Sequence, residues 1–377
     1  MEKGMEISTM KEITTELHQD FCCGQFEKGF MTRVQFFNLL EQCSYCIFPA
    51  GFVGILGNIL IIVTYFNIGL SSSINISYVA LAFSDFFCVL SNMWMALCSL
   101  PVFKRFAGQY FFPGAISSLT GAWVCECFTR ITAYMTAFIS MERCLSVMMP
   151  LKVSSIFTRG RTSAAVIVIY GLNIALASYG FVIIRFVKKF SPFYNKTIVT
   201  TNYAWSPLLE DVYNFVLIFQ SFPALMIPLV TVIVCTAFLS LSLRRSAAWR
   251  RSMVSTDQTS DERDKSLDKL PAARQRNLKE IQLAKTVVLV AVVFIVCSSP
   301  NAINVLVASV LPEYRATGRY GILFRFTNFI TFALSMVNSS SNFFIYLSTG
   351  SIFRRTLKRI LCLSSKTDKP FTKQVET

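Results

Sequence analysis

Ser140-Met141-Glu142-Arg143-Cys144-Leu145 closes a long apolar run that begins near Ala115, and the rest of the chain can be placed relative to it. A helix needs about 20 apolar residues to cross a hydrocarbon core of about 30 Å. The sequence has seven such runs, at roughly 44–67, 76–100, 115–142, 163–184, 213–242, 286–311 and 321–347. Lipid cannot satisfy unpaired backbone groups, so runs of this length predict helices and not barrel strands. The predicted fold is an all-α bundle of seven transmembrane helices.

The composition and the distribution of charge also indicate a membrane protein. Of 377 residues, 53% are hydrophobic and 15% are charged, which excludes an ordinary soluble domain. Segment 244–285 has eleven Lys/Arg against six Asp/Glu and segment 354–373 has seven against one, whereas residues 1–43 have four against seven. By the positive-inside rule, the fifth connection and the tail are cytoplasmic and the N-terminal segment is outside. The net charge of +15 therefore reflects topology and attraction to anionic membrane lipids, and we expect no nucleic-acid partner.

Three parts follow from this topology. Residues 1–43 form an extracellular segment without a signal peptide, residues 44–347 form the transmembrane domain, and residues 348–377 form an amphipathic helix and a cytoplasmic tail. The charged segment 244–280 is predicted to be partly disordered. Positions 353, 357, 360 and 361 are apolar with basic residues between them, which is the pattern of an interfacial helix. Cys362, at the end of that helix, is a candidate palmitoylation site.

Charged side chains inside a membrane helix are costly, and they commonly mark functional sites. Asp85 lies in the middle of the second span, where it is either functional or neutral and hydrogen-bonded to Asn58. Glu126 and Arg130 lie four residues apart in the third span, so they share one helix face and can pair. They form either an internal salt bridge that satisfies itself or the polar floor of a ligand pocket.

Several motifs, in chain order, resemble those of the rhodopsin-like G-protein-coupled receptors over about residues 44–362. They are Gly57-Asn58, Leu81-Ala82-x-x-Asp85, Glu142-Arg143, Pro300 and Asn342-x-x-x-Tyr346. Glu142-Arg143-Cys144-Leu145, followed by Pro150-Leu151-Lys152-Val153, is most similar to invertebrate chemosensory and neuropeptide-type receptors. The resemblance implies a multi-pass receptor of the plasma membrane. It also implies a heterotrimeric G protein as partner and an extracellular peptide or small chemosensory molecule as ligand.

The resemblance assigns roles to particular residues. Glu126 lies roughly 25 Å outward from Arg143, the depth at which the family binds ligands. The expected ligand contacts are Cys125, Glu126, Arg130, Asn301, Asn304 and Asn328. The family binds sodium at the position of Asp85, and the expected sodium and activation network is Asn58, Asp85, Thr132, Asn338, Ser339, Asn342 and Tyr346. Glu142 and Arg143 form the expected coupling switch, with an Arg143–Glu280 contact in the inactive state. Pro228 and Pro300 are the expected helix kinks.

The chain also departs from the family pattern. Cys144, Ser298 and Phe343 stand where an aromatic residue, a tryptophan and a proline are usual, and the fourth span has Tyr170 in place of a tryptophan. The loop 185–211 has no cysteine and the matching third-span position is Ser118, so the family's usual disulfide is not expected. Cys22, Cys23, Cys43 and Cys46 lie in a disulfide-permissive compartment, and their connectivity stays open. Asn195-Lys196-Thr197 is a candidate glycosylation site.

The rival class is a seven-helix small-solute transporter or channel, in which Asp85, Glu126 and Arg130 would line a path. The two halves of the sequence show no repeat, and neither the 244–285 loop nor the terminal amphipathic helix has an evident role in transport. An enzyme is not expected, because no nucleophile constellation is present and His18 is the only histidine. For the same reason no cofactor is expected apart from a sodium ion near Asp85.

Overall fold

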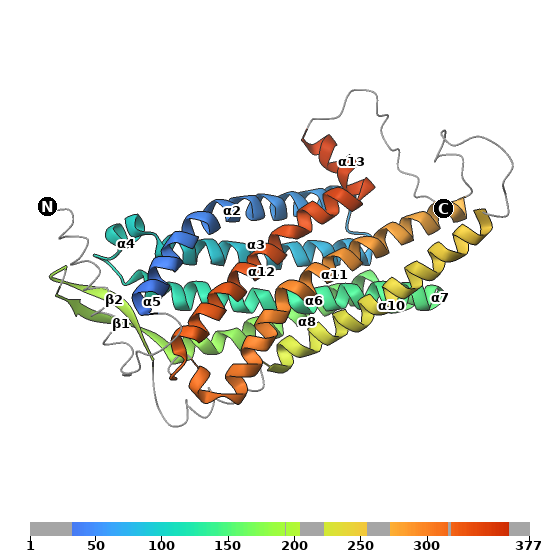
Figure 1. The fold of residues 1–377 in the computed structure, drawn as a ribbon. Helices are drawn as coiled ribbons and strands as arrows, with labels where there is room; N and C mark the ends of the chain where they lie inside the picture. The colour runs from blue at the N-terminus through green and yellow to red at the C-terminus, as the bar shows by residue number, and fades with distance from the viewer. Residues whose placement is uncertain (1–31, 193, 204–221, 255–271, 316–317, 362–377) are drawn as a thin grey trace.

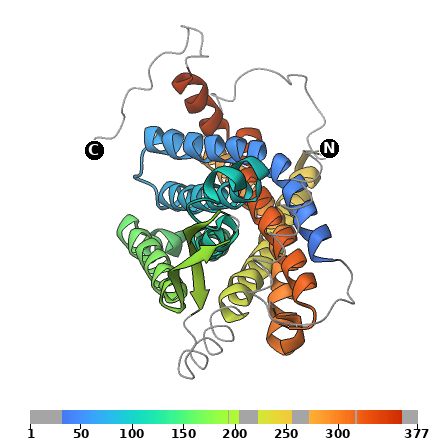
Figure 2. The same ribbon diagram turned by 90° about the vertical axis from the view of Figure 1, so that its left-hand side faces the viewer.

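The computed structural model describes residues 32–192, 194–203, 222–254, 272–315 and 318–361. Its long helices run side by side as one bundle, as Figures 1 and 2 show from two directions. They are α2 (Arg33–Ile68), α3 (Ser73–Ser99), α6 (Val124–Met148), α8 (Arg159–Ile183), α10 (Phe222–Val254), α11 (Ala272–Val310) and α12 (Gly321–Thr349). Shorter helical elements are α4 (Pro101–Ala107), α5 (Pro113–Ser117), the π-helix η1 (Ser118–Trp123), α7 (Pro150–Ile156), the 3-10 helix η4 (Pro312–Tyr314) and α13 (Ser351–Ile360). The predicted seven-helix bundle is confirmed.

Helix α6 differs from the other six long helices. Within the described residues, six helices are long and apolar enough to cross a membrane, and α6 is not among them. It carries two acid–arginine pairs, which lower its hydropathy. It packs against α3, α8, α10, α11 and α12, so its polar groups face protein rather than lipid. This placement is what a charged membrane helix requires, because lipid offers no hydrogen-bond partners.

Two helices begin well before the apolar runs that predicted them. Helix α2 starts at Arg33 instead of residue 44, because Thr32 and Gln35 form a capping box in which the Gln35 N–H donates to Thr32 Oγ1 at 3.3 Å. Helix α11 starts at Ala272 instead of residue 286, and α10 continues to Val254. Part of segment 244–280, which we expected to be partly disordered, is therefore helical. The first part of the predicted fifth span, from 213 to 221, lies outside the described residues.

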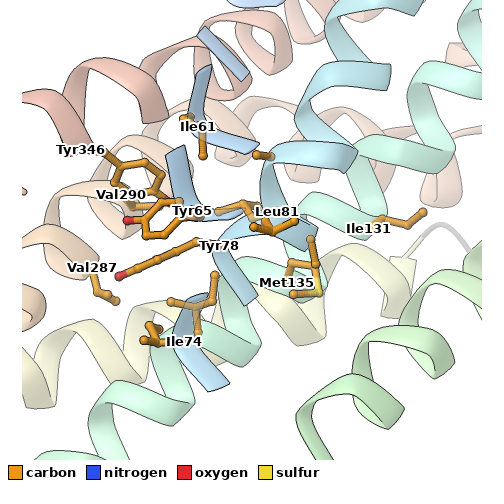
Figure 3. Packing of buried hydrophobic residues seen from close by; sticks show 14 of the residues in the cluster. Ile61, Tyr65, Ile74, Tyr78, Leu81, Ile131, Met135, Val287, Val290 and Tyr346 are labelled. Carbon is orange, nitrogen blue, oxygen red and sulfur yellow. The ribbon is translucent and has the colours of Figure 1, made fainter. Parts of the chain in front are cut away.

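An aromatic cluster joins four helices at the end of the bundle that carries α13, called the α13 end below. Tyr65 of α2, Tyr78 of α3 and Tyr346 of α12 pack together, with ring centroids 5.0 Å apart for Tyr78 and Tyr346 (Figure 3). Phe353 of α13 packs against Tyr65 in a tilted arrangement and against Tyr346 edge-on, with ring centroids 5.7 and 6.0 Å apart. Phe353 and Leu357 are buried while the basic residues of α13 are exposed, so α13 is amphipathic as predicted.

A β-hairpin at the opposite end, called the hairpin end below, was not predicted. Strands β1 (Ile184–Ser191) and β2 (Lys196–Tyr203) pair antiparallel within the segment expected to be a loop. Two backbone hydrogen bonds tie Val199 to the segment before α5, one from the Phe112 N–H at 2.8 Å and one to the Tyr110 carbonyl at 3.0 Å. These bonds hold the hairpin over the bundle at the place where the sequence lacks the family's disulfide.

The fourth long helix is also fastened in an unexpected way. The Tyr170 hydroxyl of α8 donates to the Ala80 carbonyl of α3 at 2.5 Å. Tyr170 is the residue that stands nearest to the missing tryptophan. The Tyr170 hydroxyl thus links α8 to α3, whereas most α8 residues are not buried by the rest of the protein and can face lipid.

Candidate functional site

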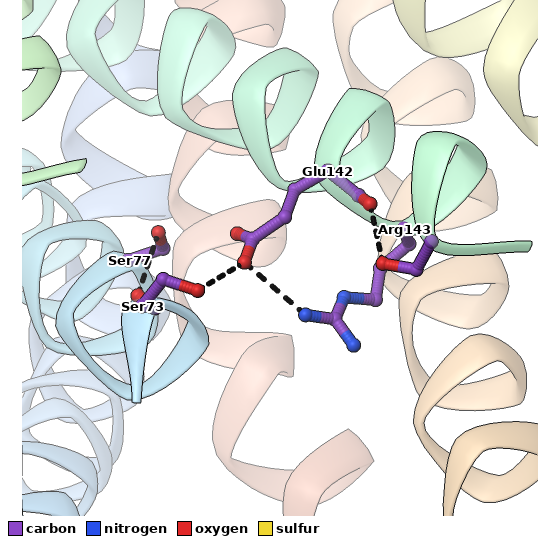
Figure 4. A network of polar contacts seen from close by, with 5 residues as sticks. Ser73, Ser77, Glu142 and Arg143 are labelled. Atoms are coloured by element: carbon purple, nitrogen blue, oxygen red, sulfur yellow. Dashed lines mark hydrogen bonds and ion pairs between the residues drawn. The ribbon is translucent and has the colours of Figure 1, made fainter. Parts of the chain in front are cut away.

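The Glu142–Arg143 pair, called the α13-side pair, closes on itself. Arg143 Nη2 lies 3.2 Å from Glu142 Oε1, and Ser73 Oγ of α3 donates to the same oxygen at 2.6 Å (Figure 4). The side chain of Arg143 is 10% exposed and that of Glu142 is 1% exposed. Ser146 also donates to the Glu142 carbonyl at 2.7 Å. Charge-assisted hydrogen bonds at this distance are strong in a buried setting, so the pair fastens the end of α6 to α3.

Other residues predicted for the coupling switch are only partly described. Glu280 lies in α11, but its side chain is outside the described residues, so the Arg143–Glu280 contact stays a prediction. Pro228 lies inside α10 and Pro300 lies inside α11. Ser298, which stands in place of the family's tryptophan, lines a cavity between α6, α11 and α12.

The Glu126–Arg130 pair, called the hairpin-side pair, is looser. Arg130 Nη1 lies 3.9 Å from Glu126 Oε1, and the side chains are 5% and 30% exposed for the arginine and the glutamate. Within the described part of the chain, Arg130 Nε and Nη2 are buried without a hydrogen-bond partner. Cys127, three residues before Arg130, contacts the Asn173 carbonyl of α8, so this face of α6 looks toward α8. The predicted pairing is present, but it satisfies only one edge of the guanidinium.

The other expected ligand contacts lie in separate places. Cys125 faces α3, where Asn92 Nδ2 donates to its sulfur at 3.1 Å. Asn304 and Asn328 bond to each other at 2.8 Å, and the hydroxyls of Tyr314 and Thr327 donate to Asn304 Oδ1 at 2.7 and 2.8 Å. This cluster fastens α11, η4 and α12 at the hairpin end. Of the six residues, Asn301 lines the cavity described next, and the other five are not in its lining as far as the described residues show.

The cavity between α6, α11 and α12 is lined mainly by hydroxyl and amide side chains. Its walls are Thr129, Thr132, Phe294, Cys297, Ser298, Asn301, Thr331, Ser335, Asn338 and Ser339. Four of these residues, Thr132, Asn301, Asn338 and Ser339, were predicted site residues. Thr331 and Ser335 were missed, although they precede Ser339 by eight and four residues and so share its helix face. That spacing was the signal in the sequence.

Asp85 lies beside this cavity and is fully hydrogen-bonded. Thr132 Oγ1 donates to Asp85 Oδ1 at 2.9 Å and Asn342 Nδ2 donates to Asp85 Oδ2 at 2.7 Å. Asn58 does not bond to Asp85, as the alternative interpretation required, but donates to the carbonyls of Gly54 and Ser339 at 3.0 and 3.1 Å. The hydrogen bond in that alternative is wrong, because Asn58 Nδ2 donates to backbone carbonyls of α2 and α12.

Tyr346 is buried in the aromatic cluster described above, and it makes no hydrogen bond to Asp85. Its hydroxyl and Asn58 Oδ1 are buried without a partner among the described residues. The expected network thus has a bonded centre, formed by Asp85, Thr132 and Asn342, and two members that do not bond to that centre.

The predicted modification sites are placed as follows. Asn195 is exposed in the turn between β1 and β2 and has a positive φ of 47°, which asparagine tolerates well. Cys43 and Cys46 of α2 are free thiols. Cys22, Cys23 and Cys362 lie outside the described residues.

Comparison with known proteins gives one family. The model of the family described as "7 transmembrane receptor (rhodopsin family)" matches residues 57–346, which is more than half of the chain. No curated protein matches the chain.

Proposed function

Because the chain belongs to the rhodopsin family of seven-transmembrane receptors, we propose that it binds an extracellular ligand near the hairpin end and activates a heterotrimeric G protein at the α13 end. In this orientation Asn195 is outside and α13 lies at the cytoplasmic surface of the plasma membrane. The basic residues of α13, among them Arg354, Arg355, Lys358 and Arg359, support it by the positive-inside rule. The rival transporter function is not favoured by the family match.

One observation carries the proposal. Helix α6 has a buried arginine near each of its ends, and the two ion pairs differ in length, 3.2 Å for Arg143–Glu142 and 3.9 Å for Arg130–Glu126. A buried guanidinium is costly unless its donors are satisfied. The α13-side pair is held by Ser73 as well, which suits a switch that rests in one state. The hairpin-side pair has donors to spare, which suits the recognition of an incoming group.

The free edge of Arg130 suggests the chemistry of that group. The N–H groups on Nε and Nη2 point in the same direction and form the parallel donor fork that carboxylates accept. We therefore propose an anionic ligand group, such as the C-terminal carboxylate of a peptide or the carboxylate of a small chemosensory molecule. Basic residues of the hairpin end favour the approach of either ligand: Lys104, Arg105, Arg185, Lys188, Lys189 and Arg325.

Asp85 and its neighbours fit a sodium ion. A hard cation prefers oxygen ligands, and Asp85, Thr132 and Ser339 bring carboxylate and hydroxyl oxygens together beside the cavity. The unpartnered Asn58 Oδ1 is a further buried oxygen near Ser339. When bound, sodium would balance the Asp85 charge. In the proposal, Asp85 holds the ion and Asn342 and Thr132 orient the carboxylate.

The first experiment measures G-protein activation in cells that express the wild type or Arg143→Ala, over a library of peptides and small odorants. Arg159→Ala is the matched control, because Arg159 is exposed at the same end of the bundle. We expect responses that Arg143→Ala abolishes and Arg159→Ala preserves, at equal surface expression. Solute or ion flux without any G-protein activation would contradict the proposal.

A second experiment tests the ligand chemistry. Once an active compound is found, its carboxylate form is compared with its primary amide in the wild type, Arg130→Met and Arg130→Lys. We expect the amide to be weaker only in the wild type, because Met offers no donor and Lys offers no planar fork. Equal potency of acid and amide in the wild type would rule out carboxylate recognition by Arg130.

A further inference from the structure

Two thiols that the proposed function does not use meet between α3 and α6. Cys88 Sγ and Cys125 Sγ lie 3.8 Å apart, and both residues are 0% exposed. Cys125 precedes Arg143 by eighteen residues, so it lies about 27 Å along the axis toward the hairpin end. The pair thus sits near the end of the bundle that the proposed orientation places outside.

The surroundings of the two sulfurs are polar, which is unusual for cysteines that only fill space. Asn92 Nδ2 donates to Cys125 Sγ at 3.1 Å, the Cys88 thiol donates to the Ser335 hydroxyl at 3.7 Å, and the Thr129 hydroxyl lies 3.5 Å from Cys88 Sγ. A donor such as Asn92 stabilises a thiolate, which is the reactive form of cysteine. The thiols are therefore held in contact with each other and with groups that favour reaction.

The cavity adjoins the pair. Thr129 and Ser335, which contact Cys88, also line the cavity between α6, α11 and α12. The cavity walls are mainly hydroxyls and amides, so the space beside Cys88 is polar. Cys297 lines the same cavity. It has no thiol within hydrogen-bonding distance in the described part of the chain.

We propose that Cys88 and Cys125 are an oxidation site at which hydrogen peroxide forms a reversible disulfide. One thiolate attacks a peroxide oxygen, the O–O bond breaks, and sulfenic acid and water result. The second thiol attacks the sulfenic sulfur, the S–S bond forms, and a second water leaves. The balance is two thiols and one hydrogen peroxide to one disulfide and two waters. The S–S bond length is about 2.05 Å, so the two sulfurs must move closer together than their present van der Waals contact. Rotation of both side chains brings them closer.

The bond would join α3 to α6 beside the cavity. Ser118 occupies the third-span position where the family usually has a cysteine, and the hairpin is tied by hydrogen bonds at Val199 and Thr201. A Cys88–Cys125 bond would therefore be a covalent restraint on this end of α6. In the proposed orientation, the pair lies inside the bundle on the side of Asp85 that faces the compartment where disulfides persist.

The test uses purified full-length receptor in lipid nanodiscs. The protein is treated with graded hydrogen peroxide, denatured, alkylated with N-ethylmaleimide and digested, and the cysteine peptides are measured by mass spectrometry. We expect the Cys88 and Cys125 peptides to lose alkylation together and to appear as one cross-linked species, lighter by two hydrogens, that a phosphine reductant reverses. Protein isolated with this cross-link already present would support the proposal equally.

Cys297 and two substitutions provide the controls. Cys297 shares the cavity, so its oxidation reports that peroxide has entered, and we expect no cross-link from it. Cys88→Ser and Cys125→Ser should each abolish the cross-linked species. If either variant folds poorly, the cross-link measured in the wild type is sufficient to test the proposal. The proposal is overturned if Cys88 and Cys125 stay alkylatable, whether or not Cys297 is oxidised, or if they oxidise singly to sulfinic acid.

Discussion

The two acid–arginine pairs of α6 contain the same chemical groups, yet burial divides their roles. In the α13-side pair the acid is the more buried partner, since Glu142 is 1% exposed and Arg143 is 10% exposed. In the hairpin-side pair the arginine is the more buried partner, since Arg130 is 5% exposed and Glu126 is 30% exposed. The first pair is closed at 3.2 Å and the second is open at 3.9 Å. A buried acid needs its arginine, whereas a buried arginine with a distant acid can accept another partner.

This difference predicts opposite effects on stability. Arg143→Met would leave Glu142 buried with Ser73 as its remaining described donor, and breaking a buried pair in this way costs about 3–5 kcal/mol. We expect the largest fall in the apparent melting temperature of purified receptor, relative to wild type and Arg159→Ala. A melting temperature like that of Arg159→Ala would mean that the α13-side pair does not stabilise the fold.

The Asp85 network lies between the two pairs, because Thr132 belongs to α6. Asp85→Asn keeps the size of the side chain but leaves one of its two buried partners facing an amide N–H, at a cost of about 1–3 kcal/mol. We expect the variant to melt below wild type in sodium-free buffer. It should also lose the rise in melting temperature that sodium chloride produces over choline chloride in wild type. A sodium effect that survives in Asp85→Asn would remove Asp85 from the ion site.

Arg130→Met should have a smaller effect of the opposite sign. The change removes a half-satisfied guanidinium and leaves Glu126 exposed enough to be solvated, so we expect stabilisation of about 1 kcal/mol. Ligand response should nevertheless fall at equal surface expression. Destabilisation as large as that of Arg143→Met would show that the two pairs are equivalent clasps, and the comparison would fail.

The smallest effect is expected at the hairpin. Asn195→Gln alters an exposed turn residue and should change stability by less than about 0.5 kcal/mol. If the hairpin end is outside, the variant should migrate faster on a gel than wild type from the same cells, and glycosidase treatment should remove the difference. Identical migration of both proteins before and after treatment would count against the use of this site.

The sequence predicts helices better than it predicts the contacts between them. Long apolar runs identify the seven helices because the membrane sets their length, but the ends depend on local capping, as Thr32 shows for α2. The hairpin was missed because its basic and aromatic residues indicate a loop. Its signal was the β-branched run from Thr197 to Thr201 after the turn at Asn195.

For the site residues too, the sequence predicts the helix on which each residue lies better than it predicts the contacts between helices. The contacts of Asp85 with Thr132 and Asn342 agree with the expected network, because the motifs lie in a fixed order along the chain. The Asn58 alternative failed, and the Cys88–Cys125 contact was not predicted, because both depend on how each helix is rotated about its axis. Cys88 and Cys125 are 37 residues apart in sequence. The packing of the helices decides whether two such side chains face each other, and a single sequence does not reveal that packing.

The most direct test compares the two acids without any ligand. Glu142→Gln and Glu126→Gln are matched in size, and each removes one negative charge from one pair. Basal nucleotide exchange on a panel of purified heterotrimeric G proteins is measured with wild type and both variants in nanodiscs. We predict that Glu142→Gln raises basal exchange because Arg143 is released, whereas Glu126→Gln leaves it at the wild-type level. A rise in both, in neither, or in Glu126→Gln alone would contradict the assignment of the switch to the α13-side pair.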